Sequence, residues 1–139
     1  MRTLWRSALT TIALVAIVVA AGAPARADVV SRSCEDGSRH FMNAWVFVTE
    51  IGPHHQWHRF DYELGGINSD KNNVDLWVVF GQDVPYWNKS PDNLRAGVPY
   101  TVIPPWPVYT WADAVEYTFM TATFDVFGPD PTCDVTVVM

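Results

Sequence analysis

The chain has 139 residues, of which 49% are hydrophobic and 17% charged, and its formal net charge is −6 at pH 7. An acidic chain without a basic patch repels nucleic acid and anionic membranes, so neither is expected as a partner. The remaining constraints on its class come from its N-terminal segment and its two cysteines.

The N-terminal segment has the layout of a secretory signal. Two arginines open the chain, residues 8–23 are almost wholly apolar, and small residues precede an expected cleavage after Ala27. The apolar stretch is about 16 residues long, short of the ~20 that a membrane-spanning helix needs. We therefore expect a signal peptide over residues 1–27 and a secreted domain over residues 28–139, with no membrane attachment after cleavage. The signal carries three arginines and no acid, so its removal makes the net charge −9.

Both cysteines, Cys34 and Cys133, lie in the expected secreted domain. An even number of cysteines in an exported chain is typical of a disulfide. This bridge would close a loop of about 100 residues, worth up to about 4.7 kcal/mol in the chain-entropy model. It also requires the first and last elements of the domain to lie side by side.

The first apolar run of the domain predicts a strand within residues 40–51. Ala44 to Val48 is unbroken in its apolar character, which is typical of a central strand covered on both faces. We therefore expect Trp45 to lie in the core. Beta-branched and aromatic residues dominate the later runs as well, and nine of the ten prolines lie in this domain, where they disfavour long helices.

Residues 56–64 alternate between apolar and polar side chains and predict a half-exposed strand. His58 and Phe60 fall on one face of it, while Trp57 and Arg59 fall on the other. Because its face carries charged residues, Trp57 is expected to be exposed.

The second half of the chain predicts further short strands. Residues 74–80, 98–103, 108–112 and 133–138 are strand-like, whereas residues 81–97 are loop-rich. Alternation within the last long apolar run, residues 114–127, changes phase, which predicts a β-bulge or a corner between sheets.

Seven or eight short strands with regular turns predict an all-β fold, a single antiparallel β-sandwich with a Greek-key or jelly-roll-like path. One disulfide joins its first and last strands. Sandwiches serve many unrelated functions, so function has to be argued from particular side chains.

The aromatic residues are the most informative candidates. Tyr86, Trp87, Trp106, Tyr109 and Trp111 lie in or beside proline-rich connections. Rings on rigid loops suit recognition because they offer contact area at little entropic cost. We expect these five residues to bind a glycan or cell-wall polymer by stacking on its sugar rings. The alternatives are that the rings plug the ends of a small sandwich, or that the partner is a protein, such as an extracellular enzyme that this chain inhibits.

Catalytic and metal-binding motifs are weak. His54, His55 and His58 lie close in sequence, and on a strand at most His54 and His58 could converge on zinc or copper, with no evident further ligands. No cofactor or metal is therefore expected, and the His54/His58 pair stands as the alternative. Asp61 and Glu63 resemble a charged outer face, and no Gly-x-Ser-x-Gly elbow occurs. The expected function is thus non-enzymatic binding outside the cell; the sequence does not indicate an oligomeric state.

Overall fold

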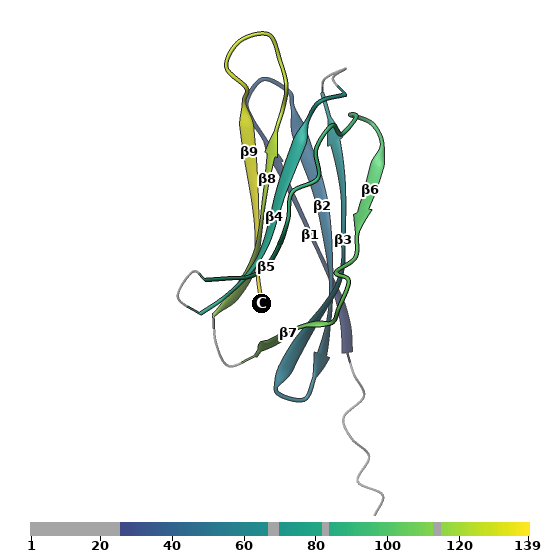
Figure 1. Cartoon of the computed structure of the whole chain (residues 1–139), viewed down its shortest axis with the longest axis vertical. Helices are drawn as coiled ribbons and strands as arrows, with labels where there is room; N and C mark the ends of the chain where they lie inside the picture. The colour runs from purple at the N-terminus through teal and green to yellow at the C-terminus, as the bar shows by residue number, and fades with distance from the viewer. Residues whose placement is uncertain (1–25, 67–69, 82–83, 113–114) are drawn as a thin grey trace, which may run out of the picture.

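The computed structural model describes residues 26–66, 70–81, 84–112 and 115–139, and within them the chain is built from strands (Figure 1). The expected signal peptide lies outside the described residues except for its last two positions. The strands are β1 (Arg26–Glu35), β2 (Phe41–Ile51), β3 (His54–Gly65), β4 (Asn73–Phe80), β5 (Val84–Lys89), β6 (Pro99–Val102), β7 (Val108–Trp111), β8 (Glu116–Thr123) and β9 (Thr132–Val138). No helix long and apolar enough to cross a membrane occurs in this part of the chain.

Two antiparallel sheets pack face to face, which confirms the predicted all-β sandwich (Figure 1). The first sheet has the order β1-β2-β3-β6, and the short strand β7 pairs with the other half of β3. The second sheet has the order β5-β4-β8-β9. Their inner faces form one core, whose fully buried large side chains include Trp57, Phe60, Tyr62, Leu64, Leu76, Met120 and Phe124.

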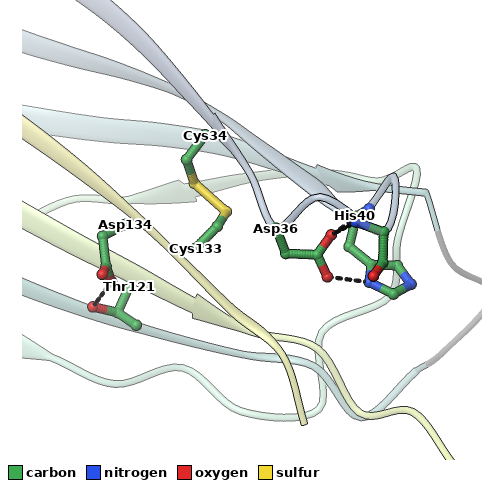
Figure 2. The surroundings of a disulfide bond; sticks show 7 residues. Cys34, Asp36, His40, Thr121, Cys133 and Asp134 are labelled. Carbon is green, nitrogen blue, oxygen red and sulfur yellow. Dashed lines mark hydrogen bonds and ion pairs between the residues drawn. A yellow bond between two sulfur atoms is a disulfide. The ribbon is translucent and has the colours of Figure 1, made fainter.

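A disulfide between Cys34 and Cys133 joins β1 to β9, as predicted from the cysteine count (Figure 2). The two Cα atoms are 5.6 Å apart, and the bridge spans 99 residues of sequence. Because β1 and β9 belong to different sheets, the bridge also fastens the two layers to each other.

The turn after β1 is organised by Asp36 (Figure 2). Its Oδ1 accepts hydrogen bonds from the backbone amides of Ser38 (2.6 Å) and His40 (3.1 Å), and its Oδ2 lies 2.5 Å from Nδ1 of His40. The imidazole of His40 also stacks on Phe124, with ring centroids 5.3 Å apart. Burial acts to raise the pKa of Asp36, but these hydrogen bonds outweigh it and lower that pKa.

Trp57 is buried, so the expectation that it is exposed was wrong. The register between β2 and β3 shifts at a β-bulge beside Val48, which places one extra residue, His58, in β3. A bulge residue reverses the alternation on one side of it. Trp57 therefore faces the core together with Phe60, although residues three positions apart lie on opposite faces of a regular strand.

Trp45 is 36% exposed, so β2 is not covered on both faces as predicted. The inner positions of β2 are Met42, Ala44, Val46 and Val48, and all four are fully buried. The intervening residues point away from the second sheet and are exposed or half-buried. The unbroken apolar run thus reflects an aromatic outer face rather than a second buried one.

β8 alternates regularly, and the bulge predicted for this segment does not occur there. Its inner residues include Glu116 and Thr118, while Tyr117 and Phe119 face outward. A charged and a hydroxyl residue at inward positions produced the apparent change of phase in the apolar pattern.

Two strands lie where the sequence predicted none. β5 occupies part of the segment expected to be loop-rich, and β1 precedes the first predicted strand. Both are edge strands of their sheets. Arg32 of β1 is exposed and Asp28 only half-buried, so this strand lacks a continuous apolar face that alternation could reveal.

Candidate functional site

The outer face of the first sheet carries a group of aromatic side chains, Trp45, Phe47, Trp106, Tyr109 and Trp111, which we call the aromatic face. Its main element is β7, at the lower end of the molecule in Figure 1. Val108 and Thr110 of β7 are buried, whereas the alternate residues Tyr109 and Trp111 are 43% and 51% exposed. The period of two in a β-strand therefore presents two neighbouring rings on one side.

His54 lies beside these two rings. It faces Trp111 directly across the β3–β7 pair, and the centroids of their rings are 4.2 Å apart. The ring of Tyr109 meets the same imidazole edge-on at 6.5 Å. These two contacts bring the rings of His54, Tyr109 and Trp111 together in one patch, with hydrogen-bonding groups at its margin.

Trp106 extends the aromatic face toward the connection between β6 and β7. Its ring is 60% exposed and lines a depression of about 210 Å³ together with Gln56, His58 and three prolines. Gln56 faces Tyr109 across the strand pair, so this depression adjoins the rings of β7. Prolines on both sides of Trp106 restrict the backbone of the connection that carries it.

A second depression of about 360 Å³ continues from the first, since His58 and Ile103 line both. Its other lining residues include Val29 and Phe47. The guanidinium of Arg59 lies 3.8 Å from the centroid of the Phe47 ring, a cation–π contact. The aromatic face thus combines flat apolar surface with a cation, an imidazole and an amide.

The structure brings together three of the five aromatic residues predicted to bind ligand: Trp106, Tyr109 and Trp111. Tyr86 is also exposed, at 58%, but it belongs to β5 of the other sheet. Trp87 is only 7% exposed, and its ring stacks on Phe60 in the core with centroids 5.5 Å apart. Trp87 thus fits the alternative that these rings plug the sandwich, because β5 turns this side chain inward opposite Val78.

Two members of the aromatic face, Trp45 and Phe47, were not among the predicted site residues. A signal for them exists in the sequence. The alternate residues of β2 are small or aliphatic at 42, 44, 46 and 48 and mostly aromatic or polar at 41, 43, 45 and 47. This alternation is typical of a strand with one buried face, and it distinguishes the inner from the outer positions of β2.

Behind β7 lies a buried polar network that the sequence did not reveal. Glu116 is fully buried, and its carboxylate bonds Nδ1 of His55 through Oε1 and the hydroxyl of Thr110 through Oε2. The indole N–H of Trp57 donates to the same hydroxyl at 2.8 Å. Burial raises the pKa of Glu116, although the bond and charge of His55 act to lower it. We call these four residues the Glu116 network.

The three clustered histidines have separate partners. His54 contacts Trp111, His55 bonds Glu116, and His58 lies 2.7 Å from the hydroxyl of Thr49. Among the described residues no group of three His, Cys, Asp or Glu side chains is placed to hold a metal ion. The geometry of the described strands therefore gives the His54/His58 alternative no third ligand.

The arrangement is suited to holding a flat, polar ligand. Aromatic rings supply stacking area, and a few polar groups at their margin fix orientation through hydrogen bonds. No protein-family model, curated protein or solved structure matches this chain.

Proposed function

We propose that this chain is an exported, non-catalytic binding protein that recognises a polysaccharide through the aromatic face. The observation that carries the proposal is the gathering of three exposed rings, Trp106, Tyr109 and Trp111, on one side of one sheet. Contiguous exposed apolar surface of this kind is uncommon on a monomeric protein without a partner.

A sugar ring is a fitting ligand for this surface because it has apolar faces and a rim of hydroxyl groups. The faces would stack on the aromatic rings, and the hydroxyls would bond the side chains of Gln56 and His58, which line the depression beside Trp106. Two depressions that share His58 and Ile103 favour a ligand longer than one sugar unit.

Export agrees with the disulfide between Cys34 and Cys133, a bond that persists in non-reducing compartments. The proposed signal peptide ends at Ala27, inside β1. Cleavage there would shorten this strand by only the two residues Arg26 and Ala27 and leave its pairs from Asp28 onward in place. Mass spectrometry of the secreted protein should then give Asp28 as the N-terminus, and an intact N-terminus in the medium would contradict this cleavage.

The experiment is a pull-down of the oxidised protein on insoluble cellulose, chitin and peptidoglycan. Tyr109→Ala and Tyr86→Ala form a matched pair, since both remove an exposed tyrosine ring but from opposite sheets. We expect Tyr109→Ala to lower retention on one polymer about tenfold, because an aromatic contact is worth about 0.5–1.5 kcal/mol beyond the area it buries and about 1.4 kcal/mol is a tenfold change in affinity. Tyr86→Ala should leave retention unchanged.

Equal loss in both variants would contradict recognition by the aromatic face. Absence of binding to all three polymers would also count against the sugar ligand. The same surface would then be tested against extracellular enzymes, with inhibition at stoichiometric protein as the measured outcome.

A further inference from the structure

The strand that carries Tyr109 and Trp111 is short and lies at the edge of its sheet. β7 has four residues, and its described pairing is with His54 to Trp57 of β3. One further backbone bond follows it, from the amide of Ala112 to the carbonyl of Pro53 at 2.9 Å. An edge strand with so few ladder bonds needs other contacts to hold its side chains in fixed positions.

Those contacts come from the second sheet through Glu116. Thr110 of β7 and His55 of β3 are directly opposite each other in the strand pair. Each bonds a different oxygen of the same carboxylate, which projects from β8. The carboxylate therefore bridges the two strands of the first sheet from inside the sandwich.

The hydroxyl of Thr110 is the link between this bridge and β7. It donates to Glu116 and accepts the indole N–H of Trp57, so both hydrogen-bonding roles of the hydroxyl are used. Thr110, Trp57 and Glu116 are each at most 2% exposed. Water therefore does not compete for these bonds, which makes each of them costly to break.

We propose that Thr110 and Glu116 are positioning residues for the aromatic face: by fixing the inner side of β7 they set the spacing and tilt of the two rings on its outer side. This inference rests on the proposed function. Tyr109 and Trp111 flank Thr110 in sequence, so any shift of Thr110 displaces both rings together. A site that stacks on a rigid ligand loses affinity when its rings are not held in advance.

The test compares Thr110→Val, which keeps the branched shape but removes the hydroxyl, with Thr110→Ser, which keeps the hydroxyl. Thr121→Val is the matched control, because Thr121 also donates to a carboxylate, that of Asp134 at 2.7 Å, but on the outer face of the second sheet (Figure 2). Two quantities are measured for each variant. The first is amide hydrogen exchange along β7 and at Ala112 in the free protein, and the second is affinity for the polymer retained in the pull-down.

We expect Thr110→Val to speed exchange at Ala112 at least tenfold and to weaken polymer binding about tenfold. Thr110→Ser and Thr121→Val should leave both quantities close to those of the unaltered protein. If Thr110→Val does not fold, Glu116→Gln supplies the second comparison. Its carboxamide oxygen can accept from Thr110 and its NH₂ can donate to His55, so the placement of β7 should survive, whereas Glu116→Ala should release it.

Unchanged exchange at Ala112 in Thr110→Val would overturn the inference whatever the ligand. Faster exchange with unchanged affinity would overturn it too, because the rings would then not depend on β7 being fixed. If the unaltered protein binds no polymer, the proposed function fails and ring positioning for that ligand fails with it. In that case the exchange data would show a purely structural role for the network.

Discussion

His55 and Thr110 face each other across β3 and β7, and each bonds one oxygen of the buried Glu116 carboxylate. The carboxylate of Glu116, from the second sheet, therefore bonds two neighbouring strands of the first sheet, β3 and β7. A buried carboxylate is costly to ionise, and here its two partners offset part of that cost.

The first prediction concerns the pH dependence of stability at Glu116. Burial raises the pKa of Glu116 above its ordinary value of 4.5. The folded protein therefore holds this proton more tightly than the unfolded chain does, and the stability contributed by the group is lost as pH rises through the raised pKa. Glu116→Gln cannot ionise. The free energy of unfolding of the unaltered protein should therefore fall relative to that of Glu116→Gln between pH 4 and pH 8. Urea unfolding at several pH values measures this difference, and parallel profiles would contradict it.

Trp57→Phe tests the other end of the Glu116 network. The change removes the indole N–H that donates to Thr110 but keeps an aromatic ring in the core. We expect the free energy of unfolding to fall by about 1–2 kcal/mol, because a buried acceptor loses its donor. Trp77→Phe is the control, since Trp77 lies half-buried on the outer face of the second sheet, stacked on Phe119. An equal loss in both variants would show that ring volume, rather than the hydrogen bond, decides the effect.

Asp36 should contribute to the loss of stability in acid. Although burial opposes it, hydrogen bonding to His40 and Ser38 lowers the pKa of Asp36 below its ordinary value of 3.8. A lowered carboxyl pKa contributes stability above the ordinary value, and this contribution is lost as pH falls through the lowered one. Compared with Asp36→Asn, the unaltered protein should lose stability more steeply below about pH 4. Thermal unfolding between pH 2 and pH 6 provides the comparison. Asp134→Asn serves as the control for removing one negative charge, and identical acid profiles for the unaltered protein and Asp36→Asn would refute the prediction.

The disulfide between Cys34 and Cys133 should contribute a large share of total stability. It spans 99 residues, for which the chain-entropy model gives about 4–5 kcal/mol, against ~5–15 kcal/mol for a typical domain. We expect the double variant Cys34→Ala/Cys133→Ala to lose about 3–5 kcal/mol in urea unfolding. Reductant should destabilise the unaltered protein and leave the double variant unaffected. A loss below about 1 kcal/mol would mean that the packing of β1 against β9 suffices without the bond.

The fold class was predictable because strand signals are local. Beta-branched and aromatic runs bounded by turn residues identified strands such as β3, β4 and β9, and the cysteine count identified the bridge. What failed was the assignment of faces. Alternation predicts a face only while the register holds, and the bulge at His58 reversed it for Trp57. Glu116 was missed because no local pattern tells a buried carboxylate from an exposed one.

The candidate site was predictable in part for a similar reason. Aromatic residues beside prolines could be recognised from sequence, and three of them gather on one face. Which sheet each connection joins depends on pairing between distant strands. For that reason Tyr86 could not be separated from Tyr109, and the inward turn of Trp87 could not be foreseen.

Polysaccharide recognition by the aromatic face is tested by the retention of the double variant Trp106→Ala/Trp111→Ala on the polymer that holds the unaltered protein. Both rings are more than half exposed, so their removal should leave the melting temperature within a few degrees of the original. If the aromatic face binds polysaccharide, retention should fall at least tenfold while the protein stays folded. Undiminished retention by a folded double variant would show that the aromatic face does not bind the polymer.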